Sequence, residues 1–269
     1  MDARFARVVA FAPMKHDPSK ISPRGPFRAD QIRAGDPYEL SKGHPLLCVP
    51  TGGRGSRANL LGGTVLASDP AVTEAGVDTG FSPDAGTMRA PDVAVGNVPD
   101  EPGWVKGAPP LAVEYADRGQ EEDELQTKIA ELIDAGTRYV WVVRLSGPRR
   151  VEVYEPEMKV RTVLPGEALV APGVLKNPVP VEALYEREAA HEVTLRNLLQ
   201  RRGFDSLEAV HAEGKLTQAR ASLRRLLTGR GLALSAEDEA RIEATADLPT
   251  LERWFDRALA ATTAADALR

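Results

Sequence analysis

The sequence predicts an α/β domain, in which a mixed sheet is flanked by helices, followed by an α-helical C-terminal region. Residues 111–115 and 139–143 are short apolar runs of the kind that forms buried strands. Between them, residues 121–135 carry apolar side chains at helical spacing, acids in the first turn and Gly136 as a stop. A strand, a helix and a second buried strand form a crossover unit, which predicts a parallel strand pair.

The other elements of the α/β domain follow from local patterns. Alternating residues on either side of a Lys-Gly turn predict a hairpin over 38–49, and a helix is expected over 54–67. Two extended stretches, 76–82 and 88–96, are separated by a Pro-Asp-Ala-Gly turn and should pair as antiparallel neighbours. A further strand is expected over 151–154.

Three regions are expected along the chain. Residues 1–37 are rich in Pro, Arg and Lys and predict an extended leader, residues 38–180 form the α/β domain, and residues 181–269 form a helical region. The helices expected in the last region cover residues 183–201, 216–227, 237–245 and 251–261.

Composition excludes several classes of protein. The chain has 269 residues and a formal net charge of −5, so any nucleic-acid contact must use a local basic patch. A single cysteine, Cys48, excludes an intrachain disulfide and a multi-cysteine zinc site. No segment resembles a signal peptide or approaches the roughly 20 apolar residues of a membrane span. We therefore expect a cytoplasmic protein without membrane contact.

The most informative feature is a carboxylate, Glu114, inside the apolar run 111–115. A buried charge is costly unless a cation or a metal pairs with it. Asp92 follows Pro91 in the neighbouring extended stretch, and adjacent strands lie only about 5 Å apart, so Asp92 and Glu114 can converge on one ion. Lys128 lies about two turns into the next helix, beside its apolar stripe, and can reach toward Glu114 because a crossover helix runs back over its strand.

These three residue types suit metal-dependent phosphodiester hydrolysis. That reaction needs carboxylates that hold Mg²⁺, and a group that orients water and balances charge on the phosphorane. Two of the three residues also have a plainer interpretation when taken alone. Asp92 can cap a turn at a strand end, and Lys128 can be a solvated lysine paired with Glu124 at i−4.

The order of these elements resembles the PD-(D/E)XK restriction-endonuclease-like superfamily, and more closely the Uma-two family of bacterial endonucleases. The resemblance covers about residues 38–183. The motifs that carry it are Tyr38-Glu39-Leu40, residues 90–95, residues 110–114, Lys128 and residues 136–143.

The resemblance implies a restriction-endonuclease-like fold and metal-dependent DNA cleavage. It places Mg²⁺ or Mn²⁺ at Asp92 and Glu114, with the backbone carbonyl of Tyr115 as a further ligand. In the typical superfamily signature a lysine stands two residues beyond the Glu, where this chain has Ala116. The Uma-two type supplies its lysine from the helix, which assigns that role to Lys128. Because nucleases that cut both strands commonly pair two active sites, we expect a homodimer.

The Gly-rich loop over 51–56 lacks the ending of a P-loop and is expected at the rim of the site. There Arg54 and Arg57 are candidates for contact with the DNA backbone. Two alternatives to an active nuclease stay open: a nuclease-derived fold kept as a DNA-binding or partner-binding module without cleavage, and a protein-interaction module that oligomerises through its helical tail.

Overall fold

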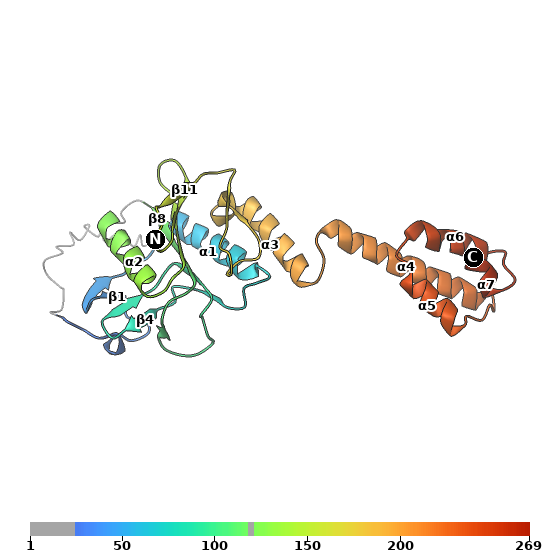
Figure 1. Ribbon diagram of the computed structural model, residues 1–269, viewed down its shortest axis with the longest axis horizontal. Coiled ribbons are helices and arrows are strands. Elements are labelled where there is room, and N and C mark those ends of the chain that lie inside the picture. Colours follow the sequence, from blue (N-terminus) through green and yellow to red (C-terminus); the bar gives the residue numbers. More distant parts are fainter. Residues whose placement is uncertain (1–24, 118–120) are drawn as a thin grey trace, which may run out of the picture.

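A computed structural model describes residues 25–117 and 121–269 of the chain. Most of the expected leader, residues 1–24, therefore lies outside the described part. Figure 1 shows two bodies, one built from sheets and helices and one from helices alone, which are joined through the long helix α4 (Leu207–Gly229).

The central feature of the first body is a mixed six-stranded sheet. Its strand order is β11-β10-β9-β8-β6-β3. The strands are β3 (Ala75–Val77), β6 (Val93–Val95), β8 (Leu111–Ala116), β9 (Tyr139–Arg144), β10 (Arg150–Tyr154) and β11 (Arg161–Val163). Strands β8 and β9 are parallel and helix α2 (Glu122–Asp134) connects them, which confirms the predicted crossover.

A second, five-stranded sheet has the order β2-β1-β5-β4-β7. Its strands are β1 (Tyr38–Ser41), β2 (His44–Leu47), β4 (Phe81–Asp84), β5 (Thr87–Arg89) and β7 (Val105–Lys106). Smaller elements of the first body are the 3₁₀ helices η1 (Ala29–Gln31) and η2 (Val181–Leu184) and the strand pair β12 (Ala168–Leu169) and β13 (Val179–Pro180).

Residues 76–82 and 88–96, each expected to form one strand, do pair antiparallel. Each of them is divided into two strands, however, and these two strands belong to different sheets. Strand β3 pairs with β6 in one sheet, and β4 pairs with β5 in the other. Asp78, between β3 and β4, has the left-handed φ of 50°, and Pro91, between β5 and β6, has no N–H to donate to a ladder. Both positions interrupt the pairing, so the chain crosses between the sheets there.

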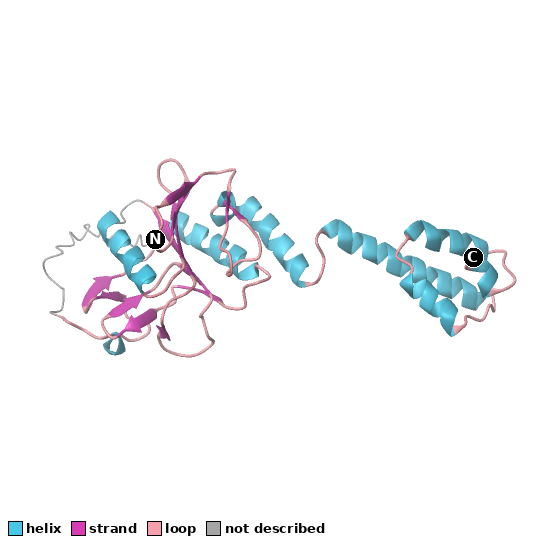
Figure 2. Ribbon diagram, viewed as in Figure 1, coloured by secondary structure: helices cyan, strands magenta, loops and turns pink. Residues whose placement is uncertain are grey.

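Helices cover both faces of the six-stranded sheet (Figure 2). Helices α1 (Gly53–Ser68) and α3 (Arg187–Arg201) pack on the face that carries Val113 and Tyr115 of β8. Helix α2 packs on the opposite face, against Ala112 and Ala116. Because successive residues of a strand point to opposite faces, Glu114 lies on the same face as α2.

Helix α3 shares the core of the first body. Ala190 and Val193 pack in the cluster under α1, and the Asn197 side-chain amide donates to Ser68 Oγ at 3.0 Å. The Arg201 guanidinium also donates to the Ser68 carbonyl at 2.8 Å. The boundary expected at residue 180 therefore separates residues that pack together, and the packing favours a boundary after α3.

The remaining helices have an apolar core of their own. They are α4, α5 (Ala236–Ala244), α6 (Leu248–Ala258) and α7 (Ala264–Ala267), and α4 is longer than the predicted 216–227. Their shared core includes Leu223, Leu227, Ile242 and Trp254. Over the described ranges, none of the helices is both long and apolar enough to cross a membrane.

Candidate functional site

A cleft of about 520 Å³ lies where the two sheets approach each other. Its polar lining includes Glu39 from β1, Asp92 from the link between β5 and β6, and Lys128 from α2. Two of the three residues singled out in the sequence therefore line one cavity, and the third, Glu114, lies buried behind Lys128.

Asp92 stands beside Glu114 because of strand register. Strands β6 and β8 are antiparallel with Val93 opposite Val113, so continuing the register by one residue places Asp92 opposite Glu114. The backbone N–H of Tyr115 donates to Asp92 Oδ2 at 2.6 Å. This bond holds the Asp92 carboxylate against the strand that carries Glu114.

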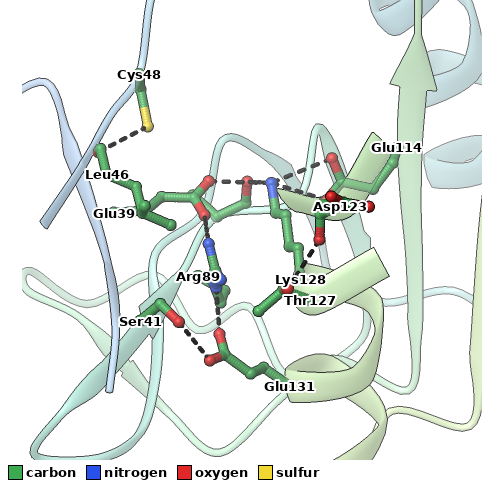
Figure 3. Close-up of polar contacts among 11 residues, drawn as sticks. Glu39, Ser41, Leu46, Cys48, Arg89, Glu114, Asp123, Thr127, Lys128 and Glu131 are labelled. Carbon is green, nitrogen blue, oxygen red and sulfur yellow. Dashed lines mark hydrogen bonds and ion pairs between the residues drawn. The ribbon is translucent and has the colours of Figure 1, made fainter. Parts of the chain in front are cut away.

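Lys128 is the cation that the buried Glu114 requires (Figure 3). Its Nζ lies 2.9 Å from Glu114 Oε1, and it donates to Glu114 Oε2 at 3.1 Å and to the Ala90 carbonyl at 2.7 Å. Their side chains are only 12% and 2% exposed, respectively. The interpretation of Lys128 as a solvated partner of Glu124 is therefore wrong, because Lys128 extends into the protein rather than along its helix.

A further chain of charges continues from Lys128 (Figure 3). Lys128 Nζ lies 3.0 Å from Glu39 Oε1, and Arg89 donates from Nη1 to Glu39 Oε2 at 3.1 Å. Arg89 also donates from Nε to Glu131 Oε2 at 2.5 Å, and the Ser41 hydroxyl donates to the other Glu131 oxygen at 2.6 Å.

Sequence reasoning missed Glu39, Arg89 and Glu131. The structure shows Arg89 at the end of a strand whose three residues are all buried, the same kind of misfit that pointed to Glu114, but Thr87 and Met88 do not form an apolar run from which the sequence could show it. Glu39 stood inside a motif of the family resemblance, but no role followed from it. Glu131 lies one turn beyond Lys128, on the helix whose apolar stripe faces the sheet.

The enclosed cluster carries excess negative charge. It contains the carboxylates of Glu39, Asp78, Asp92, Glu114 and Glu131, but the cations that pair or interact with them are Lys128 and Arg89. The cluster therefore holds three more carboxylates than cations. An enclosed site with this imbalance favours binding of protons or a divalent cation.

The imbalance changes the proton affinities of the cluster. Burial raises the pKa of Glu114 to about 8, an effect that Lys128 opposes and that Asp92 and Glu39 reinforce. Burial likewise raises the pKa of Asp92. Burial by itself lowers the pKa of Lys128, but the charges of Glu114, Glu39 and Asp92 outweigh it and raise this pKa above its usual value. The surrounding carboxylates thus keep Lys128 charged, and the raised pKa of Glu114 means that its ionisation is favoured when a further cation binds beside it.

The donor set suits a hard divalent cation. Mg²⁺ prefers oxygen ligands and is commonly held by one or two carboxylates together with waters and substrate phosphates. Asp92 and Glu114 provide two such carboxylates side by side. In the part of the chain that the structure describes, no group of three or more His, Cys, Asp and Glu side chains could hold an ion. The other ligands would therefore be water, phosphate or a backbone carbonyl such as that of Tyr115.

The two arginines predicted to contact DNA lie in the first turns of α1. Arg54 Nε donates to Asp117 Oδ2 at 2.7 Å, and its Nη2 bonds the other oxygen of the same carboxylate. Asp117 directly follows β8, so this ion pair fixes the start of α1 near the strand that carries Glu114. Arg57 is exposed. The loop ahead of α1 contributes Pro50 and Thr51 to the lining of the cleft.

Fold and comparisons together define the class of protein. The chain is similar in fold to a crystallised protein described as "a putative nuclease belonging to DUF820" from Anabaena variabilis ATCC 29413, with a TM-score of 0.52 and 16% identity. That match covers 61% of this chain and 99% of the other. The fold is thus restriction-endonuclease-like, with mixed sheets flanked by helices.

The family follows from the sequence match. Residues 27–178 match the Uma2 family, which is described as "Putative restriction endonuclease". The chain belongs to this family, which confirms the resemblance found in the sequence. No curated protein matches the chain.

Proposed function

We propose that the protein is a metal-dependent endonuclease that hydrolyses DNA phosphodiester bonds in the cytoplasm. One observation carries the proposal: Glu114, buried in β8, lies opposite Asp92 and in contact with Lys128 beside an open cleft. Carboxylates with raised pKa values in a cavity, together with a specific charged partner, are typical of functional sites. Membership of a family of nuclease-like proteins supports the same conclusion.

Each residue has a role in the proposed reaction. Asp92, Glu114 and the Tyr115 carbonyl would hold Mg²⁺ or Mn²⁺, which supplies polarisation of the phosphate and activation of water. The Lys128 ammonium remains charged, orients the attacking water and balances the charge that develops on the phosphorane. Glu39 and Ala90 hold the ammonium from its other sides, which limits its freedom to move.

DNA binding needs local positive charge, because the chain as a whole is acidic. We assign backbone contacts to Arg54 and Arg57 at the start of α1. Arg57 is exposed and accessible to a phosphate, whereas a phosphate at Arg54 must compete with Asp117. A homodimer would present two sites, one for each strand of a duplex.

Cleavage of supercoiled plasmid and of single-stranded DNA with Mg²⁺ or Mn²⁺ tests the proposal. We expect Lys128→Met to lower the rate about 10²- to 10³-fold, the usual effect of removing a group that stabilises transition-state charge. Asp92→Asn and Glu114→Gln should also abolish metal-dependent cutting. The matched control is Glu124→Gln, an exposed acid one turn before Lys128 on α2, which should cut like the wild type.

A second candidate function is a nuclease fold kept for binding DNA or a protein without cleavage. The absence of a three-residue metal cluster among the described side chains favours it. Titration calorimetry with Mn²⁺ separates the two. A folded wild-type protein that neither binds Mn²⁺ nor cuts DNA is a binding module, and a mass measurement after removal of residues 207–269 then shows whether the helical tail causes oligomerisation.

A further inference from the structure

One wall of the cleft is aromatic and is held rigidly. Trp104, just before β7, donates from its indole Nε1 to the carbonyls of Ala29 and Ile32, both at 3.1 Å. The six-membered ring lies on the backbone of Gly80, where an added Cβ would be 2.6 Å from the Trp104 Cε3 atom. The indole is therefore fixed in place before any ligand arrives, and it remains half-buried at the cleft surface.

The cleft has two chemically different parts. Lys128 and the acids, including Asp92, form the charged part. The apolar part consists of Pro37, Tyr38, Val49, Pro50, Met88 and Trp104. Val49, at 69% exposure, is an apolar side chain that the core does not explain. A ligand that fills the cleft must therefore combine a flat or apolar group with a group that binds metal or lysine.

The other two tryptophans of the chain show that this position is unusual. Trp141 is fully buried in β9, and Trp254 is buried in the core of the helical body. Both are accounted for by packing. Trp104 packs on the small cluster of Leu40 and Met88 but also presents part of its ring to the cavity. Packing alone does not require that second surface.

We propose that the cleft takes one unpaired nucleotide of the substrate, with its base against Trp104 and Tyr38 and its phosphate at Asp92 and Lys128. The protein accordingly cuts single-stranded or locally unpaired DNA in preference to continuous duplex. This inference rests on the proposed nuclease function and names the substrate class of the same site.

Charge and size support this occupant. A nucleobase is neutral, so the excess of acids in the cleft does not repel it, and aromatic stacking accepts every base. The volume of about 520 Å³ is that of a small-molecule pocket rather than of a groove for a double helix. In a duplex the bases are stacked inside and cannot reach an aromatic wall unless they are extruded from the stack.

Binding measurements test the inference separately from cleavage. The protein is the full-length wild type, which keeps Lys128, with Ca²⁺ in place of Mg²⁺ as a divalent cation that the same oxygen ligands bind. Its affinity is measured by fluorescence anisotropy for a labelled oligothymidylate and for a duplex of the same length. We expect tighter binding of the single strand, and Trp104→Leu should weaken that binding about fivefold or more while duplex binding stays unchanged.

Two control variants distinguish loss of base stacking from loss of folding. Trp104→Phe retains an aromatic ring and should bind the single strand nearly as tightly as the wild type does. If Trp104→Leu lost affinity only because it failed to fold, Trp104→Phe would not show this recovery. Trp254→Phe, in the helical body, should leave binding unchanged. Quenching of the wild-type tryptophan fluorescence by the oligothymidylate, lost in Trp104→Phe and retained in Trp254→Phe, would place the base at Trp104.

The outcomes for the inference and for the proposed function differ. Equal binding and cutting of duplex and single strand, unchanged in Trp104→Leu, would overturn the inference and leave the nuclease intact. Trp104-dependent binding of the single strand without cleavage of any DNA would overturn the nuclease and support the aromatic subsite.

Discussion

In the body formed by the sheets, a network of charged side chains is buried, whereas in the helical body most charged side chains lie at the surface, with Arg220, at 11% exposure, as an exception. Glu39, Arg89 and Glu114 are each less than a tenth exposed. Among the described residues after Arg202, the buried side chains are all apolar. There the ion pairs of Arg224 with Glu239 and Glu243 link α4 to α5 at the surface.

The comparison distinguishes charged residues that stabilise the fold from charged residues that form a functional site. An apolar core stabilises a small body without buried ions, because an ion pair must overcome the desolvation of both partners. Asp69 shows what a structural carboxylate looks like in the first body: it accepts backbone N–H bonds from Ala71, Lys176 and Asn177. The cleft acids instead contact Lys128 and Arg89 beside a cavity, and stability alone does not explain them.

The largest expected effect is on stability when a buried charge loses its partner. Arg89→Met leaves Glu39 and Glu131 without their shared guanidinium and should lower the free energy of unfolding by about 3–5 kcal/mol. The matched change in the helical body, Arg224→Met, should cost about 1 kcal/mol or less, because its ion pairs are exposed to solvent. Urea unfolding followed by tryptophan fluorescence and circular dichroism measures both.

Arg89→Lys refines this result. It keeps the charge but loses the planar fork that reaches Glu39 and Glu131 together, so its cost should fall between those of the wild type and Arg89→Met. Equal costs for Arg89→Met and Arg224→Met would contradict the contrast between the two bodies.

A smaller effect concerns pH, where the two bodies respond in opposite directions. The folded state holds a proton on Glu114 up to about pH 8, whereas the unfolded chain releases it near the usual glutamate pKa of 4.5. Between these values the folded state binds more protons, so the stability of the metal-free first body should fall as pH rises, by at most about 1.4 kcal/mol per pH unit. Unfolding midpoints at pH 6 and pH 8 measure this slope.

Glu114→Gln is the control, since an amide does not titrate and the slope should flatten. In the helical body, bonds from Ser235 lower the pKa of Asp238, and Arg224 lowers that of Glu243. The contributions of these acids are therefore lost as pH falls through the lowered values. A slope that persists in Glu114→Gln would assign the proton to another group.

The smallest effect should come from removing the helical body. A chain that ends at residue 203 keeps α3 and every residue of the core under α1, so its unfolding free energy should change by no more than about 1 kcal/mol. Aggregation of the shortened chain, or loss of its unfolding transition, would show that the helical body supports the sheets.

Much of the first body was predictable from local patterns. Apolar runs and helical spacing identified β8, α2 and β9, because periodicity reports directly which faces are buried. The partner of Glu114 was also predictable, since the cost of an unpaired buried carboxylate requires a cation nearby. The helical character of the C-terminal region followed from the same spacing.

The sequence by itself determined the strand–helix–strand unit of β8, α2 and β9, the helical character of the C-terminal region, and that Glu114 needs a cation. Only the tertiary structure decided how the extended stretches divide between two sheets, and that α3 packs with the first body. It alone placed Glu39 and Glu131 on Arg89, across separations of 50 and 42 residues. The physical reason is that the spacing of apolar residues shows which face of a strand or helix is buried, but not which other element packs or pairs with it. That partner depends on where the chain crosses between the sheets, which it does at Asp78 and Pro91.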